Sequence, residues 1–476
     1  MFPIRPHRST GSLATTSGAA AAILRARAAE WEVELIETPD SLTLHVWGST
    51  LALIPEGGVV RIELSAPEAR LTLGQQIALE DGNLIGITPL DVILRTGTRV
   101  QTLQFNLSAP FRLNDPEEES NFALGDPQAR LLFRRGARNS AIEAQLGYRE
   151  NDLDEEILFD DISNEFVTVD GGRVAQTDAR LTYVFGRESK FGGEFGLSWL
   201  KRDYTDTTDP DLDDSETRNG NIIFYLEPTS SIRARILAAA SRTDGEIDDS
   251  RTNRYGAGAS LQVDKLTNLD VELARTSIRR NENGILEETE GPSLRLDLTR
   301  SRPLGDWSLA LSSEPGTSGR RDNFSIGRTL DLRYYNLSGQ IGVTRFQGSY
   351  DPIFQIAYDQ QIDQLSQFQA SLRRAGVTDN DGDEALNTDI AASYSRQLSN
   401  VSSIGTNIRY RESEVQSGDR EDARSVSFGI NYNHALPNDF SLVAGASVIR
   451  SKDSDGERDD EEQVYLGVNR SFSFLR

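Results

Sequence analysis

The sequence contains no cysteine, and among its 476 residues it has only three histidines and one methionine. Without cysteine, the chain can form neither disulfides nor thiolate metal sites, and it has no thiol nucleophile. His7, His45 and His434 stand far apart, so no pair has the spacing of a metal-binding motif. Gly-x-Ser-x-Gly and phosphate-loop patterns are absent as well. We therefore predict a protein that is not an enzyme and that holds no cofactor.

Long apolar runs and an excess of basic residues are also missing. No stretch approaches the ~18 consecutive apolar residues of a membrane-spanning helix, which excludes a helical membrane protein. The formal net charge is −24, because 74 acidic residues outnumber 50 basic ones. This charge argues against nucleic acid as a partner. A membrane β-barrel remains compatible with the composition, since its apolar residues are spread over every second position.

Strict alternation of apolar and polar residues marks the last part of the chain, 423–476. It runs through 426–432, stops at the short connection 436–439, resumes, and stops again at the acidic run 452–462. Successive side chains of a strand point to opposite faces. The pattern therefore predicts strand, short turn, strand, acidic loop and final strand.

The same unit recurs from about Val100 onward, with acidic clusters in every second connection and short turns between them. Many of these segments alternate for ten residues or more, whereas strands of soluble proteins typically have ~5 to 6. We predict an all-β protein, a large antiparallel up-and-down transmembrane β-barrel of about 18 to 20 strands over 99–476. A soluble β-sandwich also alternates, but it has no reason to gather its acidic loops at one end.

The C-terminal segment resembles the end of a Gram-negative outer-membrane β-barrel of porin-like build. Such proteins usually end in an aromatic strand that the barrel-assembly machinery recognises, and Phe472 and Phe474 match this feature. Leu475 and Arg476 depart from it, because family members usually stop on the aromatic residue. The resemblance implies a location in the Gram-negative cell outer membrane, with its lipid and the assembly machinery as partners. It leaves the oligomeric state open.

The N-terminal part lacks the long alternating segments of the rest of the chain. Arg5, Arg8 and the Ala-rich run that follows predict a signal peptide over 1–29, with a disordered tail as the alternative. Over 30–98, short strand-like pieces are punctuated by proline and glycine. This spacing predicts a small β-rich periplasmic module. The alternatives are additional barrel strands or a plug inside the barrel.

On a lipid-immersed strand, the apolar parity faces lipid and the polar parity faces the lumen. Glycines of the polar parity, among them Gly256 and Gly258, would leave room in the lumen. Charges of both signs predict a wet interior that selects solutes; alternatively, these groups pair across strands and brace the wall. The predicted pore-lining residues are Arg130, Arg134, Glu143, Arg180, Glu194, Arg233, Arg235, Asp270, Glu272, Arg295, Asp297, Asp389 and Arg409, and Asp264 shares their parity.

Two further patterns concern the strand ends and the loops. The acidic runs 379–384 and 453–457 look like calcium loops, but they lack the glycine and glutamate positions of an EF-hand. We expect at most weak divalent cation binding there, and the alternative is a set of solvated loops.

Aromatic residues near strand ends predict interfacial girdles rather than core packing: Tyr148, Tyr183, Trp199, Tyr255, Trp307, Tyr410 and Tyr432.

These features together predict an outer-membrane channel for the passive passage or export of small polar solutes or of an exported polymer. The alternatives are a structural or adhesive surface barrel, or the barrel component of a polysaccharide export system.

Overall fold

The computed structural model describes residues 22–28, 31–38, 41–46, 49–56, 59–65, 68–113, 122–152, 158–160, 165–167, 173–205, 214–245, 248–282, 285–316, 319–378, 384–415, 422–452 and 458–475. It divides into two compact units, one of 70–472 and one of 1–69 with 473–476. None of the described residues forms a helix long and apolar enough to cross a membrane.

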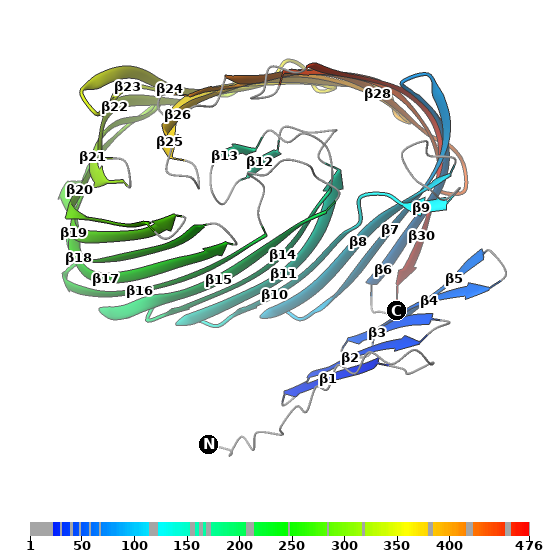
Figure 1. Ribbon diagram of the computed structural model, residues 1–476, viewed down its shortest axis with the longest axis horizontal. Helices are drawn as coiled ribbons and strands as arrows, with labels where there is room; N and C mark the ends of the chain where they lie inside the picture. Colours follow the sequence, from blue (N-terminus) through cyan, green and yellow to red (C-terminus); the bar gives the residue numbers. More distant parts are fainter. Residues whose placement is uncertain are drawn as a thin grey trace. The chain divides into compact units, whose positions relative to one another are not determined.

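The larger unit is a closed antiparallel barrel of 22 strands. Its strands follow one another around the ring in chain order (Figure 1), and the pairs β8–β10 and β30–β6 complete the circle. A short strand, β9 (Phe122–Leu124), pairs antiparallel with the end of β8. The barrel strands are β6 (Glu68–Glu80), β7 (Asn83–Gly97), β8 (Gln101–Leu113), β10 (Gln128–Gly136), β11 (Ser140–Asp152), β14 (Arg173–Phe185), β15 (Phe191–Thr205), β16 (Ser215–Thr229), β17 (Ile232–Gly245), β18 (Asp248–Asp264), β19 (Thr267–Glu282), β20 (Ile285–Arg302), β21 (Gly305–Pro315), β22 (Arg320–Asp331), β23 (Tyr335–Phe346), β24 (Ser349–Gln361), β25 (Ser366–Thr378), β26 (Glu384–Ser399), β27 (Ser402–Val415), β28 (Ala423–Ala435), β29 (Phe440–Lys452) and β30 (Arg458–Leu475).

This architecture confirms the predicted all-β up-and-down barrel and corrects its first boundary. Twenty barrel strands begin after residue 99, within the predicted 18 to 20, and two more, β6 and β7, precede it. The sequence predicts 68–97 as part of the N-terminal module, because proline and glycine residues, among them Pro67 and Gly82, punctuate the short strand-like pieces there. Asp81 and Gly82 in fact form a two-residue hairpin turn with φ of +46° and +84°. Positive φ at both positions is what a tight hairpin requires.

The smaller unit contains a five-stranded antiparallel sheet of consecutive strands. Its strands are β1 (Ala22–Ala28), β2 (Trp31–Thr38), β3 (Ser41–Val46), β4 (Ser49–Glu56) and β5 (Val59–Ser65). β1 lies inside the range predicted as a signal peptide or tail, and residues 1–21 of that range lie outside the described residues. The periplasmic location of this module and the cleavage of 1–29 stay predictions. Two short strands, β12 (Leu158–Asp160) and β13 (Glu165–Val167), pair in the connection between β11 and β14.

Apolar side chains project outward from the barrel wall at every second position. Ile236, Leu273 and Ile341 are 60%, 62% and 61% exposed, although isoleucine and leucine are normally buried. Their neighbours along each strand point inward, because side chains alternate across the sheet. The only environment in which such a wall is stable is lipid, so the apolar outer face is the membrane-contacting surface.

Toward the ends of β19 and β20 the outer wall changes from apolar to charged. Arg275 occupies the outward position after Leu273 and pairs with Glu290, and farther on Arg279 lies 3.1 Å from Glu288. Exposed ion pairs cannot lie in hydrocarbon, so this change marks one membrane boundary. Tyr255 lies directly opposite Arg275 at the same level. The predicted girdle aromatics all lie on the outer parity, which agrees with an interfacial role.

The connections differ between the two ends of the barrel. One end carries short turns, such as 98–100, 362–365 and 436–439. In the turn 362–365, the Leu365 N–H donates to Asp363 Oδ1 at 2.7 Å, and this bond holds the pKa of Asp363 below its ordinary value. The strand directions place the longer connections, including 206–214 and 453–457, together at the opposite end. The acidic runs in those connections lie mainly outside the described residues, so their divalent binding stays a prediction.

Candidate functional site

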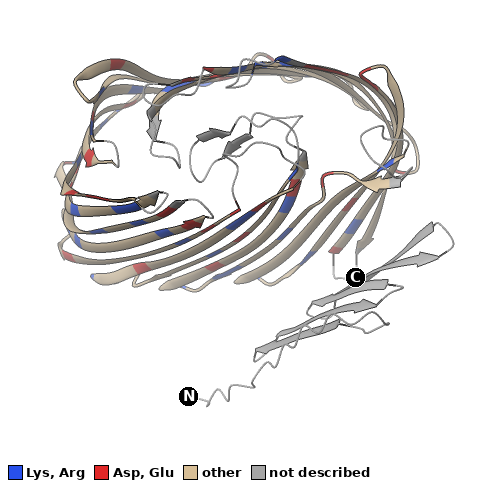
Figure 2. Cartoon of the chain, viewed as in Figure 1, with Lys and Arg blue, Asp and Glu red and all other residues tan. Residues whose placement is uncertain are grey.

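All thirteen residues predicted to line the pore occupy the inward parity of their strands. The cross-strand register shows this directly, because Arg235, Gly258, Glu272 and Arg295 form one row whose neighbours along each strand point outward. Figure 2 shows Lys, Arg, Asp and Glu distributed along the strands around the barrel wall. The structure thus places these charges on the inner wall, while their part in solute passage stays a prediction.

The inner wall of β17–β19 holds a network centred on Arg235. Its guanidinium donates two hydrogen bonds to Asp270, at 2.6 and 2.7 Å, and a third to Glu272 at 3.0 Å. Ser260 donates to Asp270 at 2.5 Å. The Arg235 and Glu272 side chains are only 16% and 14% exposed, so the network lies flat against the wall. A bidentate arginine–carboxylate pair of this kind is among the stronger polar contacts in proteins.

Gly258 makes this network geometrically feasible. Arg235 lies on β17 and both carboxylates lie on β19, so the arginine must cross the inner face of β18, a distance of about 9.5 Å between strand axes. The residue of β18 directly beside Arg235 is Gly258, and a Cβ there would lie 3.0 Å from the guanidinium carbon. The prediction that inward glycines leave room therefore holds at this position.

Two members of the network escaped the sequence analysis. Arg254 donates to Glu272 at 2.7 Å and to Glu314 at 3.0 Å, so the network extends from β17 to β21. Both residues share the inward parity of Gly256 and Ser312, and that parity was the available signal. They were missed because each lies near a loop, where alternation was harder to follow.

Smaller charged contacts flank this network. Arg295 pairs with Asp297 at 3.0 Å on β20. Arg233 donates to Glu227 at 2.6 Å and stacks over the Tyr225 ring, with 4.7 Å from its guanidinium carbon to the ring centroid. Each of these flanking pairs is neutral by itself. The larger network has one excess negative charge, because it combines three carboxylates, Asp270, Glu272 and Glu314, with two guanidiniums, Arg235 and Arg254.

A second group of predicted residues lies on β10–β15. Arg134 pairs with Glu143 at 2.9 Å, and Arg130 donates to the Gln145 side chain at 2.6 Å. The Arg134 and Glu143 side chains are 60% and 47% exposed, in contrast with the desolvated network on β17–β19. Within the part of the chain that the structure describes, Arg180 and Glu194 have neither an ion pair nor a side-chain hydrogen bond, so both project freely into the lumen.

The third group lies on β26 and β27. Asp389 accepts a hydrogen bond from Arg409 at 2.7 Å and lies 3.6 Å from Arg411. Asp264 behaves differently from its prediction, because a register shift follows Gln262 at the end of β18. Asp264 accepts hydrogen bonds from the Leu266 N–H and from Thr267, so it caps a turn and does not line the lumen.

Among the residues that the structure describes, no cluster of three or more His, Asp or Glu side chains has the arrangement of a metal site. The described inner wall therefore offers cross-strand ion pairs and free polar side chains, which can bind or repel a solute.

Known proteins are similar to this chain in fold but not in sequence. No family model matches the chain, and no curated protein matches it. The structure is similar to the ferric-catecholate import receptor Fiu from E. coli K12, with a TM-score of 0.55 and 10% identity, covering 91% of this chain and 88% of that one. It is similar to the FrpB iron transporter from Neisseria meningitidis, with a TM-score of 0.56 and 11% identity over 86% and 81% of the two chains.

A copper transporter, OprC, has a TM-score of 0.51 and 11% identity over 89% of this chain and 86% of its own. At such identities the likeness concerns the fold. Together with the closed ring of strands and the apolar outer wall, it confirms the predicted location and architecture. The chain is a 22-stranded β-barrel of the Gram-negative outer membrane.

Proposed function

We propose that the protein is a transport barrel whose interior carries small polar solutes across the outer membrane. The observation that carries this proposal is the charged inner wall, in which arginines and carboxylates of several strands pair with one another along the sheet. Side chains held flat by such pairs do not reach across the lumen. A ring of 22 strands encloses an interior far wider than side chains can fill.

The fold neighbours support a transport role at a coarse level. Their names describe an import receptor, an iron transporter and a copper transporter. Passive passage through a water-filled lumen is the finer form of our proposal, and an exported polymer is the alternative cargo. A non-enzymatic role agrees with these neighbours, whose names describe receptors and transporters.

Reconstitution of the full chain into liposomes tests the proposal. We expect the liposomes to swell in isotonic solutions of small polar solutes, with a size limit, and planar bilayers to show discrete conductance steps. Failure of both measurements, with protein that migrates as a folded barrel on an unheated gel, would overturn the transport proposal.

A pair of single-cysteine variants can show that the solute passes through the barrel itself. Ala310 and Leu311 are consecutive residues of β21 and point to the lumen and to lipid, respectively. A charged methanethiosulfonate reagent should change the conductance of Ala310→Cys and leave that of Leu311→Cys unaltered. The native chain has no cysteine, so no background reaction interferes.

A further inference from the structure

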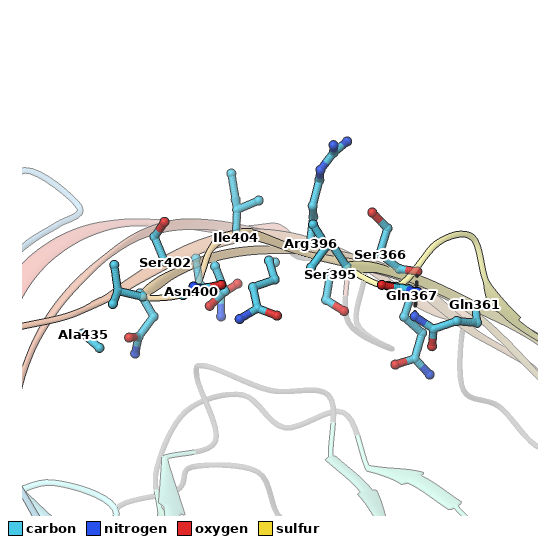
Figure 3. Close-up of a pocket in the computed structure, with 17 residues that line it drawn as sticks. Gln361, Ser366, Gln367, Ser395, Arg396, Asn400, Ser402, Ile404 and Ala435 are labelled. Carbon is cyan, nitrogen blue, oxygen red and sulfur yellow. Dashed lines mark hydrogen bonds between the residues drawn. The ribbon is translucent and has the colours of Figure 1, made fainter.

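A cavity of about 530 Å³ opens on the inner face of β24–β28, near the end with short turns. Strand residues and the turns 362–365 and 400–401 line it. Figure 3 shows Gln361, Gln367, Ser395 and Asn400 on the lumenal side of the wall, whereas Arg396 and Ile404 point away from it. We call this hollow the amide cavity, because carboxamide and hydroxyl side chains form its floor.

The strand register aligns these groups in two neighbouring rows. One row contains Gln367, Ser395, Gly405 and Asn431 on four consecutive strands. The other contains Gln397, Ser403 and Asn433. Groups within a row are about 4.8 Å apart and the rows about 6.6 Å apart, as strand spacing and rise dictate. Gly405 interrupts the first row without a side chain and so deepens the cavity.

The side chains of Gln397, Asn431 and Asn433 differ from the charged groups elsewhere on the inner wall. Within the described residues, none of the three has a side-chain hydrogen bond to protein, and all three are exposed to the lumen. Each carboxamide offers two donors and an acceptor with two lone pairs. The charged residues of β17–β21, by contrast, use their hydrogen-bonding capacity on one another. The amide cavity therefore has binding capacity that the fold itself leaves unused.

The cavity is also electrically neutral. Arg396 is the only charged residue among those that line it, and its side chain points away (Figure 3). The carboxylate of Asp359, on the inward parity of β24, accepts hydrogen bonds from Gln367 and Gln369 at 2.9 and 2.8 Å, and that of Asp363 accepts one from the Leu365 N–H within its own turn. A charged ligand would gain no counter-charge here and would lose hydration, whereas a hydroxyl can both donate to and accept from a carboxamide.

We infer that the amide cavity binds a neutral, hydroxyl-rich solute of the saccharide class within the barrel. As a step in passage through the lumen, this inference rests on the proposed transport function, but binding itself does not require transport. The cavity has the volume of a small-molecule site, and its open side toward the lumen implies weak, rapidly reversible binding. Such binding would favour neutral sugars over ions of similar size.

Binding can be measured without transport by saturation-transfer NMR on the full chain in detergent micelles. The probes are sucrose and raffinose, with glucuronate and glucosamine as charged counterparts. We expect the neutral sugars to bind more tightly than the charged ones. The double variant Asn431→Leu/Asn433→Leu should weaken binding of raffinose about tenfold, since two hydrogen-bonding side chains are lost.

The matched control is Asn221→Leu on β16. Asn221 lies opposite Gly196 in the register, as Asn431 lies opposite Gly405, and both asparagines point inward. The control should bind raffinose like the wild type. Equal binding of neutral and charged probes, or equal loss in the control and the double variant, would overturn the inference.

Liposome swelling separates this inference from the transport proposal. Swelling without selective sugar binding would leave the transport proposal standing and refute the amide cavity as a saccharide site. Sugar binding that depends on Asn431 and Asn433, with no swelling by any solute, would keep the site and refute passage through the barrel.

Discussion

Replacing Arg235 with methionine should destabilise the barrel, because two carboxylates of the inner wall share its guanidinium. Methionine keeps much of the side-chain volume and removes the charge. Asp270 and Glu272 then lose the guanidinium that both share, and they face each other as like charges on the same strand. Arg254 continues to pair with Glu272, so the network is weakened and not abolished.

The exposure of these side chains sets the expected magnitude. Removing one partner of a fully buried pair costs about 3 to 5 kcal/mol, and exposed pairs contribute about 0 to 1 kcal/mol. Arg235 is 16% exposed, Asp270 32% and Glu272 14%, which is closer to the buried limit. We therefore expect Arg235→Met to cost about 2 to 3 kcal/mol of unfolding free energy.

Urea unfolding in detergent micelles, followed by tryptophan fluorescence and by gel mobility without heating, measures this loss. The matched variant is Arg134→Met, which breaks the Arg134–Glu143 pair, with side chains 60% and 47% exposed. It should cost less than about 1 kcal/mol. Adding Asp270→Asn to Arg235→Met should restore part of the stability, because it removes the carboxylate that Arg254 does not pair with. Equal losses for the two arginine variants would refute the reasoning, since exposure would then have no influence.

Three further predictions follow from the wall and its turns. Phe428→Arg, on the outer face, should impair assembly by about 2 to 4 kcal/mol, and Ser427→Arg, on the inner face, by much less; folded yield in lipid vesicles measures both. In whole cells, a cysteine at Ser215 should react with an impermeant thiol reagent, and one at Asn438 should not, because they lie at opposite ends of the barrel. Gly305→Ala should slow or prevent folding, since Gly305 has a φ of +112° and its Cβ would lie 2.1 Å from a neighbouring carbonyl oxygen.

Each of these predictions has a contradicting outcome and a control. Equal tolerance of arginine at 427 and 428 would mean that parity does not separate lipid from lumen. Labelling of the cysteine at 438, with protection of the one at 215, would show that the barrel has the opposite orientation in the membrane. Gly348→Ala is the control for Gly305→Ala, because Gly348 also has a positive φ, +93°, but open space around its Cβ position. Equal effects of the two alanines would show that backbone conformation alone, and not the steric contact, is responsible.

The sequence by itself determined the fold class and the faces of the strands. A period of two residues indicates β-strand, so alternation at 426–432 and its repeats predicted the strands and their apolar face. The length of the strands and the acidic clusters in every second connection then favoured a barrel over a sandwich. The same parity predicted which charges lie on the inner wall. Local chemistry is sufficient for these conclusions, because the direction of each side chain depends only on its own strand.

The extent of the barrel was decided by tertiary structure. The ring closes where β30 meets β6, and there Thr72 bonds to Ser471 across 399 residues of sequence, with 3.0 Å between the hydroxyl oxygens. No pattern within either strand predicts that two segments so far apart in the sequence pair with each other. For this reason, the residue pattern of β6 and β7 does not distinguish them from strands of a separate module.

Register also decided which inner-wall residues meet. Arg235 reaches Asp270 only because Gly258 lies between them, and Arg254 joins Glu314 only because β18 and β21 curve toward the same lumen. The amide cavity has the same origin, since two rows of neutral side chains from different strands align in the closed sheet. A shift of one residue in any strand would reverse its faces and remove both arrangements, so their basis is pairing and not composition.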